Sequence, residues 1–440
     1  MRQANIIKVL YLLIFNVITL YQIYLQARNN NIVSLNLTPY SNAGEITSKM
    51  GISDAGLLLN VALTWSSFSN LQVEQFFTVN FWSPGISLIE IPLIWLESLG
   101  IPIFFSMSFL TLFLWNIVFS VHINMIEKRL PLLVSFISLI LFSFSYDHYW
   151  IFNAGLFHTE GIGYGLLSLA LLLTFKNLPN LKYFKSVLIG LILGFSILVR
   201  YSNEWAIIIA IAFFILLLFI SNMKTFEIVN KRKMITSIIL IFTTSFVVTI
   251  PWRIINHEFY SMSTWKLSAA SNELGYMIWA PEGSDSENFW GETGSNWGCR
   301  IDQIKCEALN SSNLRSFSNT YLIKEGFSSA GTSPISYLQQ RLKYGLIFYF
   351  YDKDILNLFY GFLFIFFFLI IVKKVFTSNT YLNNIAILIL LPFFIVNFFY
   401  LTLIHFEARY FFPIKLLIFL SLTFLYRSKT NKSIDNNIIS

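Results

Sequence analysis

The sequence predicts an all-α polytopic membrane protein with about ten transmembrane helices, and three observations support this. Hydrophobic residue types make up 55% of the 440 residues, whereas only 12% are charged; a soluble domain carries about a quarter charged residues. Ten stretches approach the roughly 20 apolar residues needed to cross the hydrocarbon core, and Lys and Arg cluster in alternate connecting segments. This pattern excludes a water-soluble globule, a disordered chain, a coiled coil and a secreted disulfide-rich domain.

The predicted spans show no alternating pattern of the kind found in membrane barrel strands. No clear small-x-small cleavage site follows the first span, so we expect it to stay on the protein as a helix. The spans lie near 6–25, 101–123, 132–146, 161–175, 186–200, 205–221, 234–250, 355–372, 384–403 and 410–426.

The basic residues predict that both termini are cytoplasmic. Cytoplasmic loops collect Lys and Arg, and with the N-terminus inside, every predicted inner segment carries them while the outer segment 147–160 has none. The net charge of +7 therefore reflects topology, and we expect no nucleic-acid partner. The residues are Arg2, Lys8, Lys128, Arg129, Lys176, Lys182, Lys185, Lys224, Lys231, Arg232, Lys233, Lys373, Lys374, Arg427, Lys429 and Lys432.

Two predicted outer segments are long, and loops of that length are usually functional or independently folded. They divide the chain into an N-terminal module 1–250 with its outer loop 26–100, an outer region 251–354, C-terminal helices 355–426 and a cytoplasmic tail 427–440.

The first outer loop contains two apolar segments that we interpret as helices. Residues 54–70 have the spacing of an amphipathic helix lying in the membrane interface. Residues 86–99 contain Glu90 and Pro92, so we expect an interfacial or re-entrant helix rather than a full span.

The only two cysteines, Cys299 and Cys306, lie in the second outer region with six residues between them. Two cysteines are too few for a structural zinc cluster. An oxidising compartment outside the cytoplasm predicts that they form a disulfide.

Charged residues and histidines gather at the outer ends of the spans. Each has a simple structural explanation, such as a helix cap for Asp54 and Glu160 or a snorkelling side chain for Arg200. Together on one side of the membrane, they predict chemistry at the outer interface, because a transporter more often places such groups near the midplane. They are Asp54, Asp147, His148, His158, Glu160, Arg200, Glu204, Arg253, His257, Glu258, His405, Glu407 and Arg409.

The sequence shows no motif for a cytosolic nucleotide-sugar or ATP site. Gly161-Ile162-Gly163-Tyr164-Gly165 is a glycine cluster inside a span. There is neither a His-Glu-x-x-His zinc motif nor a Gly-x-Ser-x-Gly elbow.

Four segments resemble the GT-C superfamily of integral-membrane glycosyltransferases, closest to the group of protein O-mannosyltransferases, lipid A aminoarabinose transferases and related bacterial lipopolysaccharide sugar transferases. Their order and membrane placement are similar to that group over most of the chain. Ala55 stands where many members have Glu, and Ser83 replaces the first proline of a Pro-Pro-Gly segment. The segments are Asp54-Ala55-Gly56, Phe81-Trp82-Ser83-Pro84-Gly85, Pro251-Trp252-Arg253-Ile254-Ile255-Asn256 and Glu407-Ala408-Arg409-Tyr410-Phe411-Phe412-Pro413.

The resemblance implies a GT-C-like fold and a glycosyltransferase in a bacterial inner membrane, with its active site on the periplasmic face. The implied donor is a polyprenyl-phosphate-linked hexose or pentose, and the acceptor is a glycan, lipid or protein hydroxyl. An inverting transfer needs a general base for the acceptor proton, and Asp54 is the expected base. Guanidinium groups suit the lipid phosphate, and the expected ligands are Arg409, Arg253 and Arg200.

Four further outer residues are expected to bind substrate. These are Asp147, His158, Glu160 and Glu407. Asp54, Asp147 and Glu160 also offer the hard oxygen ligands of a divalent cation, and metal dependence stays open. The aromatic residues Trp279, Trp290 and Trp297 are expected either to stack on sugar faces or to anchor the outer region at the membrane interface.

Three other functions stay open at this point. An O-antigen polymerase or ligase has a similar number of spans and one large late outer loop, but relies on arginines and not on a first-loop acid. A lipid or solute transporter would show inverted repeats and polar midplane residues, and neither is visible. A non-catalytic relative of the transferases is the third alternative.

Overall fold

The computed structural model describes residues 2–29, 43, 54–67, 83–126, 129–144, 148, 151–152, 156–177, 182–204, 207, 231–260, 274–279, 297–350, 362, 366 and 369. Every regular element among these residues is helical. The predicted spans 205–221, 355–372, 384–403 and 410–426 lie outside the described helices, so the total of ten stays a prediction.

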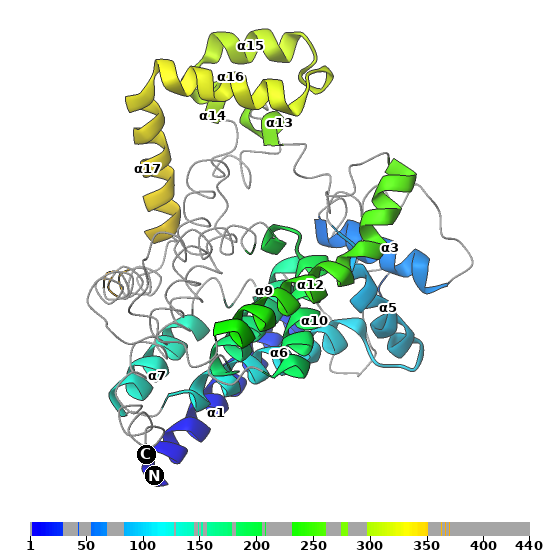
Figure 1. Cartoon of the computed structure of the whole chain (residues 1–440), viewed down its shortest axis with the longest axis vertical. Helices are drawn as coiled ribbons and strands as arrows, with labels where there is room; N and C mark the ends of the chain where they lie inside the picture. The colour runs from blue at the N-terminus through cyan, green and yellow to red at the C-terminus, as the bar shows by residue number, and fades with distance from the viewer. Residues whose placement is uncertain are drawn as a thin grey trace.

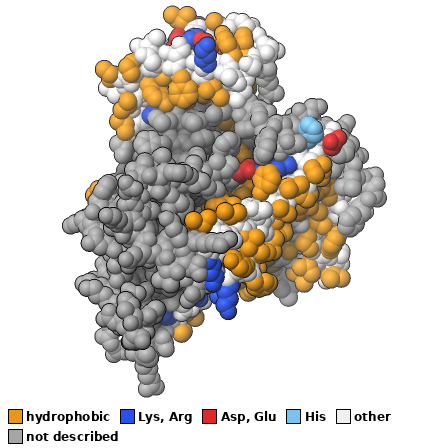
Figure 2. Space-filling view, viewed as in Figure 1, with side chains coloured by type: hydrophobic (Ala, Val, Ile, Leu, Met, Phe, Trp, Pro, Cys, Tyr) orange, Lys and Arg blue, Asp and Glu red, His pale blue; other side chains and the backbone are white. Residues whose placement is uncertain are grey.

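A bundle of long helices carries the largest buried core (Figure 1). Its described members overlap six of the predicted spans, and three of them contain segments long and apolar enough to cross a membrane: Ile6–Leu25, Ile103–Asn124 and Ile235–Glu258. Hydrophobic side chains cover much of its visible described surface (Figure 2). These features are those of an integral membrane protein. The members are α1 (Arg2–Asn29), α6 (Ile103–Asn124), α7 (Arg129–Ser143), α9 (Thr159–Asn177), α10 (Tyr183–Val199) and α12 (Lys231–Tyr260).

Buried polar side chains fix the pairing of α1 with α6. Asn16 Nδ2 donates to Asn116 Oδ1 at 2.7 Å, and Asn116 Nδ2 donates back to Asn16 Oδ1 at 2.8 Å. One turn or more away, the Tyr11 hydroxyl lies 3.5 Å from His122 Nδ1. Residue numbers fall along α6 as they rise along α1, so the two helices are antiparallel. Side-chain amides commonly link helices in this way inside membranes.

The helices α9 and α10 are also antiparallel. Lys185 Nζ donates to Asn177 Oδ1 at 2.7 Å near one end of the pair. At the other end, Gly163 faces the side chain of Arg200, and a Cβ on this glycine would lie 2.9 Å from Arg200 Cβ. The start of α9 therefore lies beside the end of α10.

A close helix contact joins α10 to α12 through the sequence Gly190-x-x-x-Gly194. An added Cβ on Gly190 would lie 2.6 Å from the Ile241 carbonyl oxygen, and one on Gly194 would lie 2.8 Å from the Ser245 carbonyl oxygen. Small residues four apart let membrane helices approach until their backbones touch. The residue numbers of the contacting positions rise together along both helices, so α10 and α12 are parallel. The predicted return span 205–221 between them requires this.

Two shorter helices from the first outer loop pack side by side, α3 (Asp54–Ser66) and α5 (Gly85–Ser98). Ser87 Oγ donates to the Leu58 carbonyl oxygen at 2.9 Å, and Trp95 Nε1 donates to the Ser66 carbonyl oxygen at 3.1 Å. In each pair the two residues are 29 positions apart in the sequence, so the two helices are parallel with an offset of 29 residues. The sequence predicted these helices to within a few residues.

The outer region forms a separate helical unit with its own core. Figure 1 shows it at the opposite end of the molecule from the start of α1. Cys299 and Cys306 are joined by a disulfide. The unit contains α13 (Leu274–Trp279), α14 (Trp297–Ile301), α15 (Gln303–Ser311), the 3₁₀-helix η5 (Leu314–Ser316) and α16 (Asn319–Thr332), and α17 (Pro334–Phe350) extends from it.

Both described tryptophans of this unit are core residues. Trp279 and Trp297 are fully buried, and Trp279 Nε1 donates to the Leu322 carbonyl oxygen at 2.9 Å. The expectation that they stack on sugars or anchor at the interface is therefore wrong for these two, because their rings fill the space between α13, α14 and α16. Trp290 lies outside the described residues.

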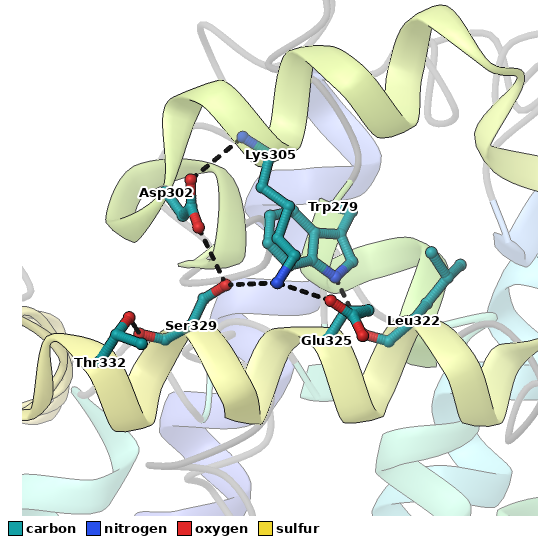
Figure 3. Close-up of polar contacts among 7 residues, drawn as sticks. All are labelled: Trp279, Asp302, Lys305, Leu322, Glu325, Ser329 and Thr332. Atoms are coloured by element: carbon teal, nitrogen blue, oxygen red, sulfur yellow. Dashed lines mark hydrogen bonds and ion pairs between the residues drawn. The ribbon is translucent and has the colours of Figure 1, made fainter.

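A polar network joins α15 to α16 (Figure 3). Lys305 Nζ lies 2.5 Å from Glu325 Oε2 and 3.4 Å from Ser329 Oγ. Ser329 Oγ donates to Asp302 Oδ2 at 3.2 Å, and Asp302 Oδ1 also caps α15 by accepting from the Lys305 backbone N–H. Each of these polar groups meets a partner, so the partly exposed network links the two helices without leaving a donor or acceptor unpaired.

We expect Gly190→Ala to destabilise the protein, because the new methyl group would overlap backbone atoms of α12. Overpacking of this kind costs about 1–3 kcal/mol, and the melting temperature of the detergent-solubilised protein should fall. Gly331→Ala is the matched control, since nothing lies within 4 Å of an added Cβ there and helical alanine is favoured over glycine by about 0.5–1 kcal/mol. Equal melting temperatures for the two variants would refute the close α10–α12 contact.

Candidate functional site

Four segments meet at one end of the bundle. They are the first turn of α9, the turn that follows α10, the last turns of α12 and the start of α5. The charge pattern predicts this end to be the outer one. Most of its charged side chains are buried against each other.

Arg200 and Glu160 form a buried ion pair between the end of α10 and the first turn of α9. Arg200 Nη1 lies 2.9 Å from Glu160 Oε1, and both side chains are almost inaccessible. The same nitrogen donates to Thr159 Oγ1 at 2.9 Å, and the guanidinium stacks 4.7 Å from the centre of the Tyr164 ring. A carboxylate at the N-terminus of α9 also interacts well with the helix dipole.

Asn203 locks the turn that carries Arg200. Its Nδ2 donates to Ser196 Oγ at 2.9 Å and to the carbonyl oxygens of Ser196 and Gly163 at 3.3 Å. The backbone N–H of Asn203 donates to the Arg200 carbonyl oxygen at 3.0 Å. The turn is thus tied to both α9 and α10, and Arg200 is fixed in place.

A second ion pair joins the same turn to α12. Arg253 Nη2 pairs with Glu204 Oε1, Arg253 Nε donates to Thr249 Oγ1 at 2.8 Å, and the guanidinium lies 4.9 Å from the centre of the Phe246 ring. Burial raises the pKa of the Glu204 carboxyl, and the charge of Arg253 opposes that rise. The turn after α10 therefore carries one member of each ion pair. Arg200 pairs with Glu160 on α9, and Glu204 pairs with Arg253 on α12.

The segment before α5 reaches this end of the bundle with a strained backbone. Ser83 is fully buried and has φ of 101°, a conformation that costs a residue with a side chain about 1–3 kcal/mol. Its Oγ donates to the Val199 carbonyl oxygen at 3.4 Å. Gly85 lies against the backbone of Leu198 and Val199, where an added Cβ would be 2.4 Å away. The tight contact holds the start of α5 beside Arg200.

The register of α3 on α5 places Asp54 at the same end. With an offset of 29 residues, position 54 is level with position 83, which contacts Val199. Asp54 is the first residue of α3; its side-chain position is outside the described part. The structure thus brings together the backbone position of the predicted base and two of the three predicted phosphate ligands.

The other predicted residues divide into three groups. His158 directly precedes α9 and lies next to the Glu160 pair in the chain. His148 is fully buried in the bundle, with Nε2 2.8 Å from Thr19 Oγ1 and the Phe152 ring 4.6 Å away, so it belongs to the bundle core. Asp147, Glu407 and Arg409 lie outside the described residues.

Glu160 is the one predicted cation ligand whose side chain the structure describes. Its carboxylate faces the guanidinium of Arg200 at 2.9 Å, and a second cation would meet that fixed positive charge. Within the described ranges, no group of three His, Cys, Asp or Glu residues is arranged to hold a metal ion. The other two predicted ligands, Asp147 and the side chain of Asp54, lie outside the described part, so the cation site stays a prediction.

Glu204, Thr159 and Asn203 were not among the predicted site residues. Glu204 has a visible signal, because an acid four residues after Arg200 and between two apolar spans is unusual. Thr159 and Asn203 have no signal of that kind, since single polar residues at span ends are common and only the packing shows what they hold.

No family model, curated protein or solved structure matches this chain.

We expect Glu160→Gln to destabilise the protein by about 3–5 kcal/mol, because it leaves the buried charge of Arg200 without its carboxylate. The double variant Glu160→Leu with Arg200→Met should lose less stability than Glu160→Gln, since it removes both charges. Thermal unfolding in detergent measures both. Glu325→Gln is the control for a partly exposed pair and should change stability by about 1 kcal/mol or less. A double variant less stable than Glu160→Gln would contradict the buried pair.

Proposed function

We propose that this chain transfers a sugar from a polyprenyl-phosphate-linked donor to an acceptor hydroxyl at the outer face of the membrane. The observation that supports this most is the convergence at one end of the bundle. Two fixed guanidinium groups lie at the end of the bundle to which the register of α3 on α5 assigns the helix start at Asp54. A carboxylate for the acceptor proton and cations for a lipid phosphate are what such a transfer needs.

Asp54 acts as the general base in this proposal. The acceptor oxygen attacks C1 of the sugar, the bond from C1 to the phosphate oxygen breaks, and the acceptor proton passes to the Asp54 carboxylate. The configuration at C1 inverts, and polyprenyl phosphate leaves with the electron pair of the broken bond. Phosphate is a fair leaving group, so the protein chiefly positions it and stabilises its charge.

The arginines act on the lipid phosphate. Arg409 is assigned as its ligand, and Arg253 and Arg200 add positive potential from fixed positions. Each of the latter two is held by a carboxylate and by a threonine hydroxyl. A guanidinium presents five N–H donors, more than one carboxylate takes up, and its fixed orientation lowers the reorganisation cost when charge develops.

We expect Asp54→Asn to abolish sugar transfer while the protein still folds. Asparagine is as good a residue as aspartate at a helix start, so a structural role alone would survive the change. The measurement is product formation from a radiolabelled polyprenyl-phosphate sugar by the purified protein, with melting temperature recorded in parallel. Asn60→Asp is the control, because it adds a carboxylate on the exposed face of α3 and should leave turnover unchanged. Full turnover by Asp54→Asn would remove this residue from the mechanism.

The donor class separates the proposal from a polymerase or ligase. We expect the protein to consume a monosaccharide on a monophosphate lipid and to leave a long diphosphate-linked glycan unreacted. The opposite preference would favour the polymerase or ligase. Movement of substrate across proteoliposomes without a covalent product would favour a transporter.

A further inference from the structure

A carboxyl group that the proposed mechanism does not use lies inside α5. Glu90 is fully buried, and neither Oε1 nor Oε2 has a hydrogen-bond partner within the part of the chain that the structure describes. An isolated carboxylate in an apolar environment costs so much that the group takes up a proton instead. Burial accordingly raises the pKa of Glu90 well above its ordinary value.

Glu90 lies between the contacts that hold α5 in place. At helical spacing it shares a face with Ile86 and Leu93, which are also buried. One turn before it, Ser87 Oγ donates to α3, and the start of the helix packs against the end of α10. A charge at this position would therefore oppose the docking of the whole helix.

Among the described residues, the elements packed against α5 place no cation within hydrogen-bond distance of the Glu90 carboxyl. These elements are α3, α6 and α10. Their titratable or charged groups lie at or near helix ends, and Glu97 near the end of α5 accepts from the Ala43 backbone N–H. The groups are Asp54 at the start of α3, His122 at the end of α6, and Tyr183, Lys185 and Arg200 at the two ends of α10.

We propose that Glu90 is a pH-sensitive switch: the folded protein carries it as a neutral acid, and its ionisation loosens α5 from the bundle. α5 holds Ser83 and Gly85 against the end of α10 and carries α3 alongside it. Loosening it therefore moves the start of α3 away from Arg200. The consequence for sugar transfer rests on the proposed function, whereas the switch itself does not.

The sign of the pH dependence follows from linkage. The unfolded chain ionises Glu90 near pH 4.3, whereas the folded protein keeps the proton to a higher pH. The stability due to this group is complete below the unfolded pKa and is lost as pH rises toward the folded pKa. Over that interval the folding equilibrium constant falls about tenfold per pH unit.

The test compares the wild type with Glu90→Gln, which cannot ionise. Between pH 6 and the folded pKa of Glu90, we expect the unfolding equilibrium constant of the wild type to rise with pH. The rise should be about tenfold per pH unit steeper than for the variant. The readout is the pH dependence of the unfolding equilibrium constant and not its absolute value, because the buried amide of the variant lowers stability at every pH. Glu97→Gln on the same helix is the control and should keep the wild-type slope. Parallel slopes for wild type and Glu90→Gln would overturn the proposal.

Hydrogen exchange on the wild type alone provides a second readout if the variant does not fold. As the pH rises from 6 toward the folded pKa, we expect the protection factors of α5 amides to fall more than those of α10. Unchanged protection in α5 would also overturn the switch. Neither measurement uses sugar transfer, so an inactive protein with the expected slope would reject the proposed function and leave the switch in place.

Discussion

The cost of placing charge inside an apolar helix bundle determines how this end of the molecule is built. Arg200 and Arg253 are almost completely buried, and each is paired with a carboxylate, a threonine hydroxyl and an aromatic ring. Unpaired, either would cost several kcal/mol. The pairs therefore fix the first turn of α9, the turn after α10 and the last turns of α12 relative to one another.

Helix packing places the remaining parts of the candidate site on this frame. The glycines at 190 and 194 let α10 and α12 touch, which sets Arg253 beside Glu204. The strained backbone at Ser83 and the tight contact at Gly85 seat α5 on the end of α10. The register of α3 then positions Asp54. A site assembled from segments 200 residues apart in the sequence thus depends on a few close backbone contacts.

The sequence predicted the helices well and their contacts only in part. Apolar length alone located the spans that became α6 and α9 to within a few residues, because the bilayer sets that length. Charge position also indicated that Glu160 and Arg200 belong to one end of the bundle. Their direct pairing, and the part played by Glu204, depend on which helices are neighbours, and one sequence carries little information about that.

The outer unit shows the other limit of sequence reasoning. The aromatic residues Trp279 and Trp297 were expected to stack on sugars or to anchor at the membrane interface, whereas the structure buries both rings between short helices. Asp302 and Ser318 cap two of these helices, and such capping residues followed by a mixed polar and apolar stretch were the available signal. A unit with a small core and a disulfide gives weak periodicity, because few of its positions are buried.

The orientation of the candidate site in the membrane is the most direct test of this account. Single cysteines at Ser53, Asn153 and Glu407 would be treated with a membrane-impermeant maleimide in intact spheroplasts, with Asn177→Cys as the cytoplasmic control and Cys299 and Cys306 left in their disulfide. We expect the first three positions to label from outside and the control to label only after lysis. Labelling of position 53 or 407 only after lysis would contradict a shared outer site.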